Sequence, residues 1–111
     1  MRKYRNIPVV IDGIRFDSKG EARRWGALRL QERAGLIDQL DRQVSFTLVE
    51  KTAQDRAVTY RVDFTYRKAG RLIAEDFKGY ETKEFKLKAK LFRAKYPEYD
   101  LIITNSKGMN Q

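Results

Sequence analysis

The sequence predicts an α/β domain with a central mixed β-sheet flanked by two helices, in the order αβββαβ after an N-terminal β-hairpin. Two segments, 18–34 and 82–96, begin at helix-capping residues and end at a glycine or a proline. Before, between and after them lie short segments with the apolar and alternating patterns of strands. Strands that alternate with helices are typical of α/β and α+β domains. The 111 residues suffice for one domain, which we expect to span 1–111.

The first predicted element is a β-hairpin over residues 7–16. Residues 7–11 are mostly apolar, and Pro8 favours an edge strand or the start of a strand. Asp12-Gly13 is a strong signal for a tight turn, after which residues 14–16 form the returning strand. A basic arm over residues 1–6 precedes the hairpin.

The first predicted helix runs from about residue 18 to residue 34. Ser18 and Glu21 form an S-x-x-E capping box, and Gly35 suits the position that follows the last helical turn. At about 100° per residue, Glu21, Trp25 and Leu28 fall on one stripe of the helix. We expect this stripe to face the core, with Glu21 pointing inward.

Three consecutive strands are predicted over residues 40–49, 57–67 and 71–78. In the second of them, apolar and aromatic side chains alternate with polar ones, so that Asp63 lies on the polar face and the apolar residues all face the other way. The tight turn Lys68-Ala69-Gly70 pairs this strand with the next and places Asp63 opposite about residue 75.

The second helix is predicted over residues 82–96, from the capping residue Thr82 to the residue before Pro97. Its apolar set includes Leu87 and the stripe Phe85, Phe92 and Tyr96, which we interpret as core. A last strand follows over residues 99–104, and the tail from about residue 105 to 111 is expected to fray.

The composition excludes several classes of chemistry. The chain has no cysteine and no histidine, which rules out disulfides, thiolate or imidazole zinc sites and histidine general bases. Any catalysis must therefore use carboxylates, lysine, hydroxyl groups or metals held by oxygen. No apolar run is long enough to span a membrane, and the N-terminus lacks the pattern of a signal peptide, so we expect a cytoplasmic protein.

The net charge of +9 favours a polyanionic partner, and nucleic acid is the commonest one. The surplus lies at the two ends, because residues 36–78 hold eight basic and seven acidic residues. A surface that only binds phosphate has no need of central acids, whereas a metal site between basic arms does. The alternative is charge that only keeps the protein in solution. The candidate DNA-binding residues are Arg2, Lys3, Arg5, Arg42, Lys83, Lys86 and Lys90.

The residues most indicative of chemistry are Asp63, Asp76 and Lys78. In a strand, Asp76 and Lys78 point the same way, about 7 Å apart. The hairpin turn brings Asp63 near Asp76 on the adjacent strand. Two carboxylates from neighbouring strands are ligands that Mg²⁺ or Mn²⁺ prefers, and a nearby lysine can orient a water or neutralise a phosphate. The pattern therefore suits metal-assisted hydrolysis of a phosphodiester bond.

These residues, in this order, resemble the signature of the PD-(D/E)XK nuclease superfamily. Asp63 is followed after a hairpin by Asp76-Phe77-Lys78, and Glu21 lies on the helix before the sheet. Arg42-Gln43 is similar to the Arg-Gln pair of very-short-patch-repair-like relatives. Residues 3–104 look like small phage and prophage proteins of this superfamily and like Holliday-junction-resolvase-like nucleases. The chain departs from the motif in that Val62, and not proline, precedes Asp63.

The resemblance implies a restriction-endonuclease-like fold and a divalent-metal-dependent DNA endonuclease, selective for branched DNA or junctions and derived from a phage or prophage. It implies that Asp63, Asp76 and the Phe77 carbonyl ligate Mg²⁺ or Mn²⁺, while Lys78 assists the water. Glu21 would bind a second metal or a metal-bound water, and Gln43 would orient a water or a phosphate. Symmetric cutting of a junction would need a homodimer.

Each of these assignments has a structural alternative. Glu21 fits its place in the capping box as well as it fits a ligand role. Asp63 fits a solvated strand residue, and Asp76 with Lys78 fits a surface ion pair. Glu75 points away from Asp76, and is either exposed or the true ligand if the strand has a one-residue bulge. At the level of function, the alternatives are a catalytically inactive nucleic-acid-binding protein with the same fold, and a phage structural or host-interaction protein.

Overall fold

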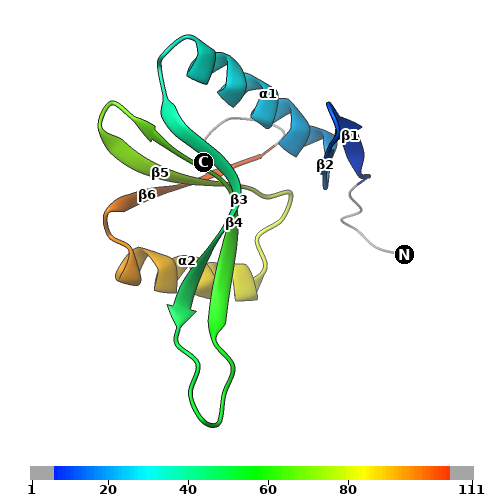
Figure 1. The fold of residues 1–111 in the computed structure, drawn as a ribbon. Helices are drawn as coiled ribbons and strands as arrows, with labels where there is room; N and C mark the ends of the chain where they lie inside the picture. Colours follow the sequence, from blue (N-terminus) through cyan, green and yellow to red (C-terminus); the bar gives the residue numbers. More distant parts are fainter. Residues whose placement is uncertain (1–6, 106–111) are drawn as a thin grey trace.

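The computed structural model describes residues 7–105, which form two helices and six strands in the predicted order (Figure 1). The central sheet has four strands in the order β3-β4-β5-β6; β5 and β6 are parallel and the other neighbours are antiparallel. The mixed sheet with two helices in one α/β domain is therefore confirmed. The predicted basic arm, with Arg2, Lys3 and Arg5, and residues 106–111 of the predicted tail lie outside the described residues.

The N-terminal hairpin forms a two-stranded sheet of its own, from β1 (Val9–Ile11) and β2 (Ile14–Phe16). Its turn residues Asp12 and Gly13 have φ angles of 53° and 79°. Two successive positive φ angles are those of a type I′ turn, whose twist matches that of the flanking strands. The strand begins two residues later than predicted, after Ile7 and Pro8.

Both helices begin at the predicted caps. In α1 (Lys19–Arg33) the Ser18 hydroxyl accepts the Glu21 N–H at 3.1 Å, and in α2 (Lys83–Lys95) the Thr82 hydroxyl accepts the Phe85 N–H at 3.0 Å. Each bond satisfies a backbone donor that the helix itself leaves free. Leu87, an apolar residue of α2, lies outside the core, because 57% of its surface is exposed.

The sheet strands are β3 (Asp38–Val49), β4 (Val58–Lys68), β5 (Arg71–Phe77) and β6 (Tyr99–Thr104). Ala69 and Gly70 join β4 to β5 with φ angles of 52° and 81°, a second turn of the type I′ kind. The last strand has its predicted bounds, whereas β5 ends one residue before the predicted end, at Phe77.

The two helices cover opposite faces of β5. Ile73 packs in the α1 cluster, the buried residues Leu28, Ile37, Phe64, Tyr66 and Ile73. Its neighbour Ala74 packs in the α2 cluster, the buried residues Phe46, Leu48, Tyr60, Val62, Ala74, Phe85, Ala89 and Phe92. Because successive side chains of a strand point to opposite faces, α1 and α2 lie on opposite sides of the sheet. Figure 1 shows the sheet between the two helices.

The apolar side chains of β4 are buried as predicted, with the exception of Val58, but they pack in two different clusters. Tyr60 and Val62 belong to the α2 cluster, whereas Phe64 and Tyr66 belong to the α1 cluster. The prediction that they all face one way is therefore wrong in this respect. Because same-parity side chains of a regular strand share one face, the backbone of β4 must change its facing between Val62 and Phe64. The change occurs on either side of Asp63.

No helix within residues 7–105 is long and apolar enough to cross a membrane.

Candidate functional site

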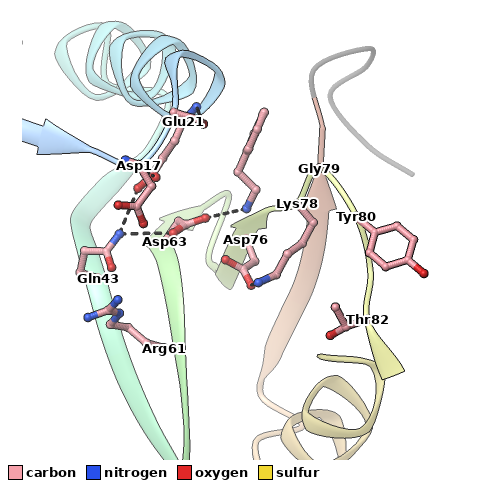
Figure 2. A pocket seen from close by; sticks show the side chains of 12 residues that line it. Asp17, Glu21, Gln43, Arg61, Asp63, Asp76, Lys78, Gly79, Tyr80 and Thr82 are labelled. Carbon is pink, nitrogen blue, oxygen red and sulfur yellow. Dashed lines mark hydrogen bonds and ion pairs between the residues drawn. The ribbon is translucent and has the colours of Figure 1, made fainter. Parts of the chain in front are cut away.

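A hollow of about 360 Å³ opens where β4 and β5 diverge. The ladder between these strands ends at the pair Phe64 and Glu75, so that Asp63 and Asp76 are the first residues beyond it. The hollow is lined by six predicted residues from one helix, three strands and the loop after β5: Glu21, Gln43, Asp63, Asp76, Phe77 and Lys78 (Figure 2). The shared orientation of Asp76 and Lys78 is therefore as predicted.

Asp63 receives two hydrogen bonds at this divergence. Its Oδ2 accepts the Phe77 N–H at 2.8 Å, and its Oδ1 accepts the Gln43 Nε2–H at 3.3 Å. Burial, followed by the neighbouring Asp76 carboxylate, raises the pKa of Asp63 to about 8. Two carboxylates this close repel each other when both are charged, which favours a proton or a cation between them.

Asp76 is almost completely buried, with 2% of its surface exposed. Its Oδ2 accepts the Tyr60 hydroxyl at 2.7 Å and lies 3.3 Å from the Lys78 Nζ, whose side chain is 31% exposed. Burial, followed by the Asp76 charge, raises the pKa of Tyr60, which keeps that hydroxyl neutral as a donor. The interpretation of Asp76 and Lys78 as a surface ion pair is wrong, because the carboxylate lies inside a central strand.

Glu21 bonds the backbone at Asp17, and not the Ser18 amide that the capping box predicts; its role as a ligand stays a prediction. It is 3% exposed, its Oε1 accepts the Asp17 N–H at 3.3 Å, and its Oε2 accepts the Gln43 Nε2–H at 3.0 Å. Burial is the main reason why the pKa of Glu21 is raised. The carboxylate thus bonds the chain just before the helix and still borders the hollow.

Gln43 joins the acids of the hollow. Its Nε2 donates to both Glu21 and Asp63, as the dashed lines in Figure 2 show. It has a φ angle of 56°, in the left-handed region that side-chain-bearing residues rarely adopt. Such backbone strain costs about 1–3 kcal/mol and often occurs at functional sites. The sequence indicated this residue only weakly, because a strand pattern gives no signal for a glutamine with a left-handed backbone conformation.

Glu75 does not line the hollow, and both predicted alternatives for it are wrong. It is fully buried under α1, and the β5 pairing shows no bulge. Arg24 of α1 binds it through two N–H groups, at 2.5 Å and 2.9 Å, and the Tyr66 hydroxyl donates to it at 2.7 Å. A charge buried this deeply needs such partners, and Arg24 supplies them from a turn of helix that the sequence did not single out.

The candidate DNA-binding residues lie in different places. Lys83, Lys86 and Lys90 are exposed on α2. Arg42 is half-buried, with its guanidinium 4.8 Å from the Phe16 ring centroid. The structure adds Asp17 and Arg61 to the hollow, neither of which was predicted there. The capping box just after Asp17 was the one available signal for it.

The acids of the hollow fit a divalent cation that retains some of its waters. Within residues 7–105, no three acidic side chains converge as a ready metal cage. Mg²⁺ usually needs only one or two carboxylates, with water and substrate phosphate completing its shell. The adjacent Asp63 and Asp76, whose mutual repulsion a cation would relieve, provide such a pair.

Fold and site together define an α/β protein with a carboxylate–lysine hollow at the divergence of two central strands. The chain belongs to the DUF1064 family, described as a protein of unknown function, whose family model matches residues 1–110. A sequence search of curated proteins finds no match to it.

Proposed function

We propose that this protein is a divalent-metal-dependent DNA endonuclease of the PD-(D/E)XK type, with a restriction-endonuclease-like fold. The observation that supports the proposal most is the meeting of Asp63, Asp76 and Lys78 at one hollow, with Glu21 from α1 beside them. This set matches the residues that the sequence motif indicates. The mixed sheet with a helix on each face is consistent with the proposed fold.

Each residue of the hollow has a role in the proposed reaction. Asp63 and Asp76 would hold Mg²⁺ or Mn²⁺, with the Phe77 carbonyl as a further oxygen donor. The bound cation would supply a water of lowered pKa and would offset negative charge on the phosphate. Lys78 donates N–H groups into the hollow, where they orient a water or bind a phosphate oxygen. Tyr60 holds the Asp76 carboxylate in place, and Gln43 does so for Asp63 and Glu21.

A catalytically inactive nucleic-acid-binding protein is the second candidate. It would explain the net charge of +9, which is the observation in its favour. It would not explain three buried or half-buried acids at one hollow, because such acids repel DNA and are costly to bury without a cation. We therefore favour the enzyme.

The proposal includes selectivity for branched DNA or junctions, cutting by a homodimer, a phage or prophage origin, and a cytoplasmic location. A domain of this size has little surface for reading a long sequence, which is why we favour recognition of DNA shape.

The test is cleavage of labelled DNA by the purified full chain. Linear, nicked, flapped and four-way substrates are incubated with Mg²⁺, with Mn²⁺ and with EDTA. We expect metal-dependent cleavage that is lost in Asp63→Asn and in Asp76→Asn. In Lys78→Gln it should fall about 10²–10³-fold, the usual effect of removing one charge-stabilising donor.

Asp38→Asn is the matched control for the cleavage test. Asp38 is an exposed acid that pairs with Arg67 on the surface, so its loss should leave cleavage unchanged. Cleavage that survives in both Asp63→Asn and Asp76→Asn would refute the assignment. DNA binding without cleavage of any substrate would favour the inactive binding protein.

A further inference from the structure

A second, smaller hollow of about 160 Å³ adjoins the acidic one. Three arginines from three strands line it: Arg15 of β2, Arg42 of β3 and Arg61 of β4. Asp17, Glu21 and Gln43 complete its wall, and these three residues and Arg61 also line the acidic hollow. The two hollows therefore share a wall, and Figure 2 shows Arg61 below Gln43 beside the acids.

Arg42 is held in a fixed orientation with most of its donors unused. Its guanidinium lies 4.8 Å from the ring centroid of Phe16 and 5.7 Å from that of Trp25. Its Nη2 donates one long bond of 3.4 Å to the Arg15 carbonyl, and its Nε is buried with no partner among the described residues. A preorganised guanidinium with unmet donors is suited to a ligand that brings several acceptors.

The other two arginines are free to turn toward a ligand. Arg61 is exposed and has no ion pair or side-chain hydrogen bond within residues 7–105. Arg15 pairs with Asp17 at 3.2 Å, but both side chains are more than half exposed, at 63% and 65%. Exposed pairs of this kind contribute little to stability, so a stronger acceptor can displace Asp17.

The charge of the smaller hollow favours an anion. Three arginines face two carboxylates, and Glu21 already accepts bonds from the Asp17 N–H and from Gln43. Phosphate matches the planar fork of a guanidinium through paired, charge-assisted hydrogen bonds. Successive phosphates of a nucleic-acid strand also lie close together, so that one strand can place a phosphate in each of the two adjoining hollows.

We propose that this arginine hollow binds a backbone phosphate of nucleic acid next to the phosphate at the acidic hollow. Arg42 is the fixed anchor, and Arg15 of the N-terminal hairpin and Arg61 of β4 close on the phosphate. This inference rests on the proposed function for the identity of the adjacent phosphate. It gives the bound strand a direction, from β2 and β3 across the hollow toward Lys78.

The test is the salt dependence of DNA binding, measured by fluorescence anisotropy in EDTA so that no cleavage occurs. Wild type, Arg42→Gln, Arg61→Gln and Arg15→Gln are titrated onto a labelled duplex at several KCl concentrations. Each lost phosphate contact lowers the slope of log K against log salt by about 0.9. We expect this decrease in Arg42→Gln, in Arg61→Gln and in Arg15→Gln.

Arg67→Gln and Arg71→Gln are the matched controls. Both arginines are exposed, and each pairs with an acid, Asp38 or Asp100, near the turn between β4 and β5. They remove the same charge elsewhere, so the slope should stay that of wild type. Thermal unfolding checks that each variant folds. If Arg42→Gln does not fold, the salt-dependence slopes of Arg61→Gln and Arg15→Gln test the phosphate site.

The outcomes separate this inference from the proposed function. A wild-type slope in both Arg61→Gln and Arg15→Gln overturns the phosphate site, whether or not the enzyme cuts. An equal decrease in the controls, or no DNA binding by wild type, overturns it as well. A decrease confined to the arginine hollow, without cleavage in Mg²⁺, supports the phosphate site and contradicts the nuclease.

Discussion

Asp63 makes the stability of the metal-free protein depend on pH. Burial and the Asp76 charge raise its pKa to about 8, from 3.8 for an ordinary aspartate. The folded state therefore binds a proton that the unfolded state releases over this range. The resulting stabilisation is fully present below pH 3.8 and is lost as the pH rises through 8.

We predict that in EDTA the free energy of unfolding falls between pH 5 and pH 8, by at most about 1.4 kcal/mol per pH unit for this one proton. Urea unfolding at each pH measures it. In Asp63→Asn, which cannot titrate, the decrease should be smaller. An equal decrease in both proteins would show that other groups cause it.

The candidate site was predictable residue by residue only in part. The parity of a strand placed Asp76 and Lys78 on one face, and the tight turn placed Asp63 opposite about residue 75 and so near Asp76. The hydrogen bonds that hold the acids come from Tyr60 and Gln43, which a strand pattern presents as an ordinary aromatic and an ordinary polar residue. Those bonds depend on the change of facing in β4 around Asp63 and on the strained backbone of β3, and neither has a local signal.

At the level of elements, β5 uses one face to hold α1 and the other to present Asp76. Glu75 binds Arg24, and Phe77 lies against Gly20, where an added Cβ would overlap its ring. Both contacts lie within one turn of Glu21 on the helix. The position of Glu21 at the hollow is therefore set by the two residues that flank Asp76 in β5.

We predict that Glu75→Ala destabilises the protein by about 3–5 kcal/mol, the usual cost of leaving a buried ion pair without one partner. Arg24 would keep its charge in a site where only 13% of its side chain is exposed. The double variant Arg24→Met/Glu75→Leu should regain much of the loss, because it buries no unpaired charge. Urea unfolding measures both, and a double variant as unstable as Glu75→Ala would contradict this account.

Gly20→Ala tests the contact at the start of α1. On helix propensity alone, alanine in place of glycine stabilises a helix by about 1 kcal/mol. The overlap with the Phe77 ring reverses this sign, and we predict a net destabilisation of about 1–3 kcal/mol. Phe77→Leu in the same chain removes the ring and should restore stability. A Gly20→Ala protein more stable than wild type would show that the ring moves aside freely.

The order of elements was more predictable than their geometry. Capping residues and the two glycine-containing turns are local signals, and all of them form as predicted. The left-handed Gln39 and Gln43 in β3 and the register shift between Asp38 and Asp41 had no such signal. Gln43 lies where β3 passes from Leu40, which packs against the α1 cluster, to Val44, which packs against the α2 cluster, a change set by tertiary packing.

For the whole molecule, the net charge of +9 and the acidic hollow have opposite effects on a nucleic acid. The positive surface attracts the backbone, whereas Glu21, Asp63 and Asp76 repel a phosphate that enters the hollow. A divalent cation at the acids would remove this conflict, and it would bind the folded chain, where the acids meet. Metal should therefore stabilise the whole fold.

We predict that Mg²⁺ raises the melting temperature of the wild-type protein. A ligand at 100 times its Kd stabilises the folded state by about 2.7 kcal/mol, which corresponds to roughly 10 °C or more for a domain near this size. The shift should be larger at pH 8 than at pH 6, because the cation competes with the proton on Asp63. Differential scanning calorimetry with NaCl at matched ionic strength separates binding from screening. The same shift in the Asp63→Asn/Asp76→Asn double variant would mean that Mg²⁺ binds elsewhere, and the conflict between surface and hollow would then need another resolution.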